Sequence, residues 1–231
     1  MRHTLTLTAL MVLFVGLSAF TAAAQELSPR AYWPAPKGTK VAVAGYAYSF
    51  GDVLTDPSLP ITGVDSKINS IVVAYLQTLS LWGRTSNFVV ELPYVWGSTE
   101  GSLENTPTRR ELSGVGDLGI TLSVNLRGAP SMTPADFQRL RKNPHSIFGA
   151  SVKILVPTGH YEPDMLINVG ANRWAVKPEL GYMIPIHSRL LLELELGAWF
   201  FQDNDEFLGV TREQDPVIAS EVHMEIGRAH V

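Results

Sequence analysis

Cysteine is absent from this chain of 231 residues. An exported protein with this composition has no disulfide framework to staple its fold. Beyond residue 24, no stretch approaches the roughly 18 uninterrupted apolar residues of a membrane-spanning helix. Runs of basic residues are also absent, and the formal net charge is −4. The chain therefore lacks the electrostatic signature of a nucleic-acid-binding protein.

The N-terminal end has the composition of an export signal. Arg2 gives a short positive region, and residues 7–20 give an apolar one. An A-x-A motif follows at 22–24. This order predicts a signal peptide over 1–24 that is cleaved near Ala24. The mature chain is therefore expected to leave a bacterial cytoplasm.

Two further segments lie outside the predicted fold. Residues 25–40 are rich in proline and predict an extended N-terminal arm. Residues 225–231 resemble the translation of a sequencing-library adapter, so we expect a non-native tail there. On this interpretation the natural sequence is interrupted after Met224, and the folded part, 41–224, is truncated.

Alternation of apolar and polar residues dominates the mature chain. In residues 115–127 the even positions from Leu118 to Leu126 are apolar, and the odd positions from Asp117 to Arg127 are polar or glycine. A period of two predicts a β-strand with two different faces. The same pattern predicts strands at 41–50, 68–82, 87–96, 115–127, 147–156, 175–186 and 190–201, with an eighth beginning at 216–224.

The connections between these strands differ in length. Segment 128–146 contains Thr133 and Pro134, which predict an N-cap and the first residue of a small helix. The other connections are predicted as long polar loops at 51–67, 97–113 and 157–173, and as short turns at 83–86 and 187–189.

One apolar and one polar face on every strand is typical of a wall with lipid outside and water inside. Trp82, Trp96 and Trp174 lie towards strand ends, as interfacial aromatic girdles require. We therefore predict an all-β fold: an antiparallel up-and-down transmembrane β-barrel of the outer-membrane type, incomplete with its seven or eight strands. A soluble β-sandwich shows the same alternation and is the alternative.

Parity predicts the register of the last hairpin. Outward residues are even-numbered on both strands that flank 187–189, so the loop between them has an odd number of residues. The simplest register pairs Ile186 with Leu190, and it then pairs Glu179 with Gly197.

Motifs that carry chemistry are few. Residues 114–119 match G-x-G-x-x-G, but a strand follows where a dinucleotide site needs a helix, so we expect a bend there. The six histidines show no metal-ligand spacing. His187 and Ser188 suit an outer-membrane lipid esterase only if their side chains converge, and adjacent turn residues usually diverge. We predict no catalytic residue, metal or cofactor, and no enzyme.

Charged residues on the predicted inward face form the candidate site. They either fill a narrow lumen as a polar network or form a charged constriction that selects solutes, and the sequence leaves both open. The loop at 158–173, with Tyr161, Met165, Leu166 and Ile167, is either a plug or capture site or an ordinary surface loop. The seven inward charges are Glu91, Asp117, Lys153, Lys177, Glu179, Glu193 and Glu195.

The stretch 147–182 carries the motif of a known family. With Gly114, Gly116 and Asp117 upstream, it resembles the outer-membrane family associated with the meta-pathway of phenol degradation, whose members are labelled transporters. The resemblance implies an outer-membrane barrel, of about twelve strands in complete members. It also implies passage of aromatic or other hydrophobic compounds. The motif residues are Pro157, Thr158, Gly159, Tyr161, Asn168, Gly170, Asn172, Trp174, Lys177, Pro178, Glu179 and Gly181.

These expectations define a function and a set of partners. We expect a porin-like channel or transporter of the bacterial outer membrane for small hydrophobic or aromatic compounds. Its partners are membrane lipid, the barrel-assembly machinery and the solute, and nucleic acid is not among them. The alternative is a structural or binding barrel whose lumen is filled by side chains and transports nothing.

Overall fold

The computed structural model describes residues 32–52, 61–103, 105–187 and 190–226. The predicted leader 1–24, residues 25–31 of the arm and residues 227–231 of the tail lie outside the described residues. The strands are β1 (Lys40–Asp52), β2 (Ile61–Leu81), β3 (Arg84–Leu103), β4 (Thr106–Val115), β5 (Leu118–Arg127), β6 (Ile147–Val156), β7 (Ala175–His187), β8 (Leu190–Phe201), β9 (Asn204–Phe207), β10 (Val210–Arg212) and β11 (Val217–Ile226). Helix α2 (Pro134–Lys142) lies between β5 and β6 in the sequence.

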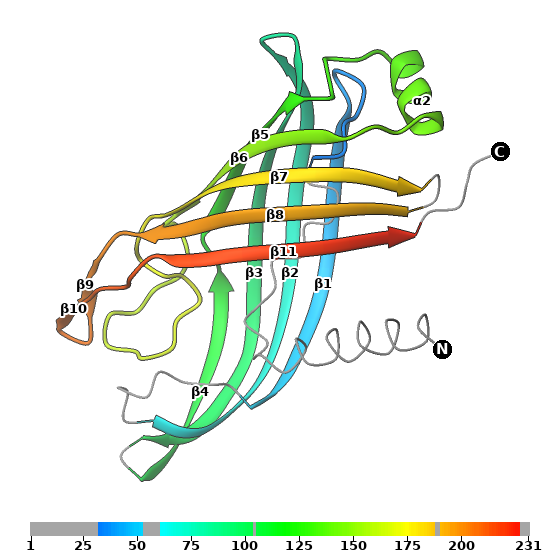
Figure 1. Cartoon of the computed structure of the whole chain (residues 1–231). Coiled ribbons are helices and arrows are strands. Elements are labelled where there is room, and N and C mark those ends of the chain that lie inside the picture. The colour runs from blue at the N-terminus through cyan, green and yellow to red at the C-terminus, as the bar shows by residue number, and fades with distance from the viewer. Residues whose placement is uncertain (1–31, 53–60, 104, 188–189, 227–231) are drawn as a thin grey trace, which may run out of the picture.

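One curved antiparallel sheet of nine strands makes up most of the described chain (Figure 1). Its order is β1-β2-β3-β5-β6-β7-β8-β11, while β4 pairs with the distal half of β3. Strands β9 and β10 form a separate hairpin. Neighbours in the sheet follow one another along the chain almost throughout, so the predicted antiparallel up-and-down order is confirmed.

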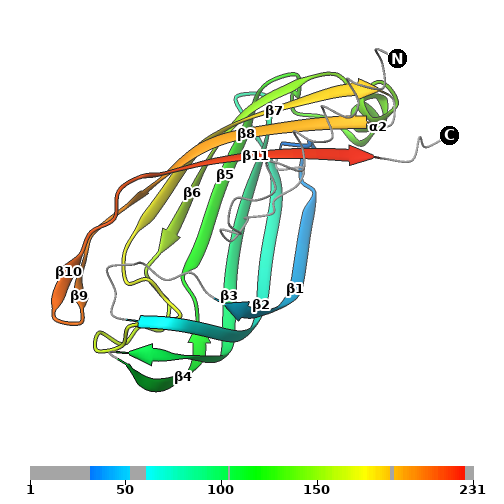
Figure 2. The ribbon, with the colours of Figure 1, turned by 60° about the horizontal axis from the view of Figure 1, so that its bottom comes forward.

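The two faces of the sheet differ in chemistry, as the alternation predicts. Figure 2 shows the strands curling around a common interior. Because a curled sheet shields its inner face, the poorly accessible side chains lie on the concave side. Buried polar residues include Thr78, Asn87, Ser123, Lys177 and Glu195, while exposed large apolar residues include Tyr46, Ile71, Leu92, Leu122, Leu180 and Leu196.

Among the described residues, no helix is long and apolar enough to cross a membrane.

The predicted loop at 97–113 is wrong, because this segment is mostly strand. Strand β3 continues to Leu103 and turns directly into β4. Polar pairs such as Glu100 opposite Arg109 hold this hairpin together, and those two side chains form an ion pair. The hairpin is polar on both faces, so it lacks the alternation on which the prediction rested. Strand β2 begins early, at Ile61, for the same reason.

The turn between β2 and β3 is tighter than predicted. Leu81 pairs with Arg84, which leaves only Trp82 and Gly83 in the turn. Both have positive φ angles, 51° and 73°. Two central residues with positive φ are typical of the type I′ turn, which matches the twist of the flanking strands. The predicted short turn is therefore confirmed, although its predicted length of four residues is wrong.

The register of β7 and β8 agrees with the prediction in its middle and departs from it at the end. Glu179 pairs with Gly197, as predicted. The predicted pair of Ile186 with Leu190 is wrong, because His187 takes that place after a register shift beyond Pro185. Proline has no N–H to donate to the ladder, so a bulge beside it is expected.

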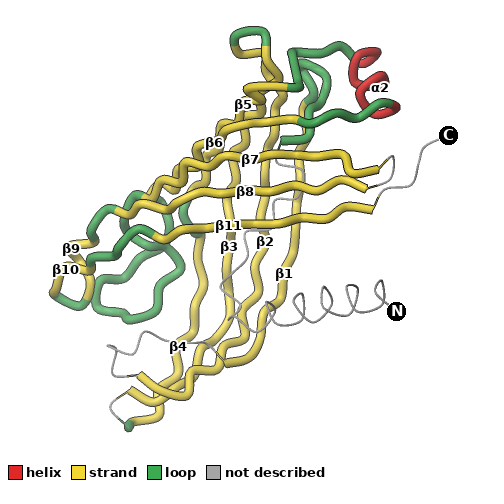
Figure 3. The backbone as a smooth tube through the Cα atoms, in the orientation of Figure 1, coloured by secondary structure: helices red, strands yellow, loops and turns green. Residues whose placement is uncertain are grey.

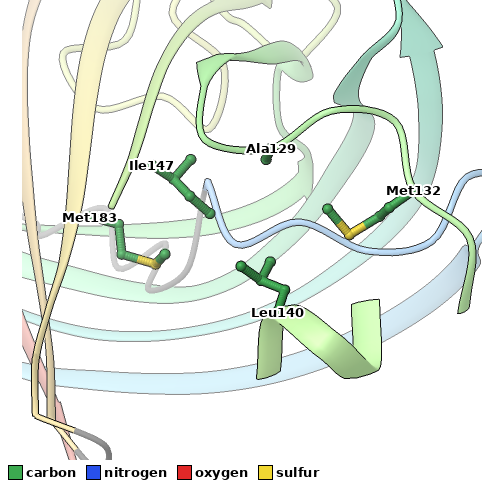
Figure 4. Close-up of a cluster of buried hydrophobic side chains, with 5 residues drawn as sticks. All are labelled: Ala129, Met132, Leu140, Ile147 and Met183. Atoms are coloured by element: carbon green, nitrogen blue, oxygen red, sulfur yellow. The ribbon is translucent and has the colours of Figure 1, made fainter. Parts of the chain in front are cut away.

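Helix α2 lies at one end of the curved sheet (Figure 1). Thr133 is its N-cap and Pro134 its first residue, as predicted. Leu140 of α2 packs in a buried apolar cluster with residues from the start of β6 and from β7 (Figure 4). Trp33 of the N-terminal arm packs against the same cluster. The five buried members are Ala129, Met132, Leu140, Ile147 and Met183.

The cap of α2 is expected to contribute measurably to its stability. Thr133 and Asp136 form a capping box, and the hydrogen bonds from Thr133 lower the pKa of Asp136. Thr133→Ala removes the cap and is expected to destabilise the helix by about 1 kcal/mol. Hydrogen exchange over residues 134–142 is then expected to become several-fold faster. Thr106→Ala, at an exposed position in β4, is the control, and equal exchange in the two variants would contradict this role.

Candidate functional site: the concave face and its covered mouth

Ion pairs line the concave face. Lys153 of β6 reaches Glu91 of β3 with a nitrogen–oxygen distance of 2.5 Å. Strand β5 lies between them and presents Gly119 opposite Glu91. A Cβ atom at Gly119 would lie 2.6 Å from Cγ of Glu91, so only glycine leaves room for this pair to cross.

A second charged group lies on β7 and β8. Lys177 and Glu179 form an ion pair of 2.9 Å, and Lys177 also lies over the ring of Trp199. Glu193 and Glu195 come from β8, where Glu195 is paired directly with Gly181. All four of these charged side chains are buried. The structure thus brings together four of the seven predicted inward charges, and it links Glu91 and Lys153 separately.

Asp117 departs from the other inward charges. It lies at the break between β4 and β5 and binds the long loop that joins β6 to β7. Its Oδ1 accepts a hydrogen bond from the N–H of Gly159 at 2.9 Å, and its Oδ2 accepts one from Ala171 at 2.8 Å. One carboxylate therefore binds the backbone at both ends of the loop and holds them together. The bend predicted at 114–119 is observed at this break.

The motif residues of the loop hold its backbone. Gly159 and Gly170 approach so closely that a Cβ on either would lie within 2.8 Å of the other's backbone. Asn168 Oδ1 accepts from the N–H of Glu162 at 2.8 Å, and its Nδ2 donates to the carbonyl of Met165 at 2.8 Å. The motif therefore encodes a loop of fixed shape.

The loop also contacts the β9–β10 hairpin, beside which Figure 3 shows it. Tyr161 donates a hydrogen bond to the carbonyl of Glu206 at 2.9 Å. Asn172, with a positive φ of 52°, donates to Oδ1 of Asn204 at 3.1 Å. The hairpin was missed in the sequence because strands of four and three residues are too short for alternation to register.

An apolar pocket of about 450 Å³ lies between the loop and the β3–β4 hairpin. This volume lies within the range of ligand pockets, roughly 300–1,000 Å³. A salt bridge of 2.7 Å from Arg110 to Glu162 joins the loop to the hairpin and lowers the pKa of Glu162. The pair therefore persists until the pH falls below the ordinary range of a glutamate. The apolar lining includes Leu103, Met165, Leu166, Ile167 and Leu208.

Tyr32 of the N-terminal arm occupies the concave face and is fully buried. Its ring lies over Gly149 and Gly181, which pair directly across β6 and β7, and a methyl group at either position would overlap the ring. Its hydroxyl oxygen lies 3.1 Å from both Glu179 Oε1 and Ser151 Oγ, so its one proton is shared between these two acceptors. Burial raises the pKa of this phenol, which keeps it protonated as a donor.

Sequence reasoning missed Tyr32, although a signal was present. Gly149 and Gly181 both fall on the inward face of their strands and form a notch where larger side chains would otherwise stand. His187, considered for an esterase pair, is the last residue of β7. Its predicted partner Ser188 lies outside the described residues.

Comparison with known proteins places the chain in a family. A family model described as "Putative MetA-pathway of phenol degradation" matches residues 56–220. The chain belongs to this family. A search of curated proteins found no match. The match to the phenol-degradation family covers β2 to β10, the start of β11 and the loop bound by Asp117, and it confirms the resemblance seen in the sequence.

A solved structure shares the fold of this family member. The crystal structure of the COG4313 outer membrane channel from Pseudomonas putida F1 matches with a TM-score of 0.62 and 23% sequence identity. The match covers 85% of this chain and 69% of that one. With the antiparallel curled sheet, it confirms the predicted fold class of an outer-membrane β-barrel.

Proposed function

We propose that this protein is an outer-membrane channel that admits small hydrophobic or aromatic solutes. The observation that carries the proposal is the apolar pocket at the mouth of a wall whose concave face is polar. Its shape depends on motif residues of the phenol-degradation family, since these hold the loop that lines it. An apolar solute would leave water in this pocket before it passes along the wall. The related COG4313 protein is itself an outer membrane channel.

The same proposal fixes the orientation of the chain. A signal peptide over 1–24 exports it, and the assembly machinery of the outer membrane inserts it among lipids. The N-terminal arm and α2 then lie at the periplasmic end, while the β3–β4 hairpin, the loop 157–174 and β9–β10 lie at the outer end. Exposed apolar side chains such as Leu180 and Leu196 face lipid.

Strands β1 and β11 are the two edges of the sheet in the described residues. A bilayer does not tolerate unpaired backbone N–H and C=O groups, because no water satisfies them there. We propose that both edges are paired in the membrane. Heat-modifiable migration on a gel identifies this folded form, and the assays below use it.

A filled, non-transporting barrel is the second candidate. Buried Tyr32 and its hydrogen bonds to Glu179 and Ser151 favour it, because they occupy part of the interior. Within the residues that the structure describes, no group of side chains suggests chemistry on a substrate, and we propose transport rather than catalysis. The two candidates differ in whether solute crosses the wall.

Solute uptake separates these candidates. Liposomes that contain the folded protein are expected to take up a fluorescent aromatic tracer faster than protein-free liposomes. Leu166→Glu places a charge in the apolar pocket, which is expected to weaken capture about tenfold, as for the loss of one buried leucine. The initial rate of uptake at low tracer concentration measures this loss.

Val210→Glu is the matched control. Val210 is exposed on the nearby β10 and does not line the pocket, so this variant adds the same charge at the same end of the molecule. It is expected to leave uptake unchanged. Equal uptake with and without protein would exclude the channel and favour the filled barrel.

A further inference from the structure

Three potential metal ligands meet where β8 and β11 pair. Glu221 of β11 lies directly opposite Glu195 of β8. His223 is two residues further along β11, so it lies on the same concave face, opposite Glu193. The expectation of no metal site rested on spacing along the chain. Pairing of two strands brings these ligands together although some 28 positions separate them in sequence.

The donor atoms are close enough to share one ion. One donor atom from each of Glu195, Glu221 and His223 lies within 4.8 Å of the other two. His223 Nε2 lies 3.0 Å from Glu221 Oε2. Among the described residues this is the only group of histidine and carboxylate side chains with such geometry.

Glu195 supplies an independent indication of a ligand. Its side chain is only 5% exposed, and its Oε1 atom has no hydrogen-bond partner. Buried carboxylate oxygens in folded proteins are normally paired, because an unpaired one loses its hydration without compensation. The carboxylates of Glu179, Glu193 and Glu221 lie near enough to repel it further. A cation between Glu195 and His223 would satisfy the unpartnered oxygen and offset this repulsion.

We propose that Glu195, Glu221 and His223 bind a divalent transition-metal ion, with Zn²⁺ as the representative, on the inner wall of the barrel. Imidazole with carboxylates is a donor set that suits Zn²⁺, whereas Ca²⁺ and Mg²⁺ take oxygen ligands alone. Three protein ligands leave the remaining position to water from the lumen. The ion joins β8 to β11 and reduces the negative charge on this part of the concave face. This site is separate from the apolar pocket at the mouth.

Titration of Zn²⁺ into the chelator-treated, folded protein in detergent micelles tests the site. Calorimetry is expected to show one saturable ion per chain. His223→Ala and Glu195→Gln are each expected to weaken binding by roughly tenfold or more, because each removes one ligand. Zn²⁺ is also expected to raise the melting temperature of the parent protein and to leave that of both variants unchanged.

The chain contains a matched control for this experiment. His160 and Glu162 repeat the same i, i+2 pair in the outer loop, at 3.3 Å, but they are exposed and have no third ligand. His160→Ala is therefore expected to retain binding. Glu195→Gln is expected to fold at least as well as the parent without metal, since it removes a buried carboxylate that lies close to three others. Absence of saturable Zn²⁺ binding, binding that survives His223→Ala, or Ca²⁺ binding as tight as Zn²⁺ binding would each overturn the proposal.

Discussion

Replacing Gly181 with valine is expected to expel Tyr32 from the concave face and release the N-terminal arm. A side chain at this position would occupy the space of the aromatic ring. The ring already fills the space above the paired Gly149, so it cannot move there instead. The ring cannot shift while its hydroxyl remains bound to Glu179 and Ser151. Loss of a buried aromatic side chain from its site typically costs about 3–5 kcal/mol.

Other contacts also hold the arm. Trp33 packs against the apolar cluster beneath α2, and the N–H of Lys37 donates to the carbonyl of Met132. Trp33 adjoins Tyr32 and is expected to leave with it in Gly181→Val, so the arm is expected to detach as far as Ala35 and to stay attached near Lys37. Because the chain lacks cysteine, a single Ala35→Cys substitution provides a unique site for a spin label.

The spectrum of that label measures the release. The label is expected to be immobilised in the parent protein and mobile when Gly181→Val is added. Gly45→Val is the matched control, since it makes the same change in β1 where no atom lies within 4 Å of the added Cβ. An immobilised label in Gly181→Val would show that the glycine notch does not seat the ring. If the arm restricts the channel, tracer uptake is also expected to increase in this variant alone.

Much of the fold follows from the sequence because one force dominates the wall. Each strand has lipid on one side and polar side chains on the other, so alternation is strong enough to locate β5, β6 and β8 within a few residues. The same reasoning failed wherever that contrast disappears. The distal β3–β4 hairpin is polar on both faces, and its pairing depends on backbone hydrogen bonds and on cross-strand pairs such as Glu100 with Arg109.

The candidate site was predictable only in part, for a different reason. Parity assigns Lys177 and Glu179 to the inward face, and the structure places them there. It says nothing about what reaches them from elsewhere in the chain. Tyr32 comes from an arm rich in proline, which has no periodicity, and its seat is a gap left by two glycines 32 residues apart. Such a contact depends on shape in three dimensions.

Asp117 shows how a correct residue received an incomplete role. Its odd number placed it with the lumen charges, and the family resemblance placed it in a block with Gly114 and Gly116, but neither revealed its partners. The structure gives it two backbone donors from the ends of the loop 157–174. A carboxylate that accepts hydrogen bonds from two N–H groups 12 residues apart holds the two ends of the loop together.

Asp117→Ala is therefore expected to open the loop while the sheet remains folded. The N–H groups of Gly159 and Ala171 lose their acceptor, and hydrogen bonds to charged groups contribute about 1.5–3 kcal/mol each. Amide hydrogen exchange over residues 157–174 is expected to accelerate roughly a hundredfold to ten-thousandfold, because the two bonds together contribute about 3–6 kcal/mol and a factor of ten corresponds to about 1.4 kcal/mol. Exchange in β6 and β7 is expected to change little, because their ladder bonds do not involve Asp117.

Two further variants distinguish the loss of these hydrogen bonds from a general loss of negative charge. Asp117→Asn keeps one acceptor oxygen and loses the other, so its exchange is expected to lie between that of the parent and that of Asp117→Ala. Asp215→Asn, at an exposed position, removes the same charge and is expected to leave the loop unchanged. An opened loop also carries Met165, Leu166 and Ile167 away from the β3–β4 hairpin, which dismantles the apolar pocket. Tracer uptake in Asp117→Ala should then fall as it does in Leu166→Glu, and undiminished uptake with an opened loop would separate the pocket from transport.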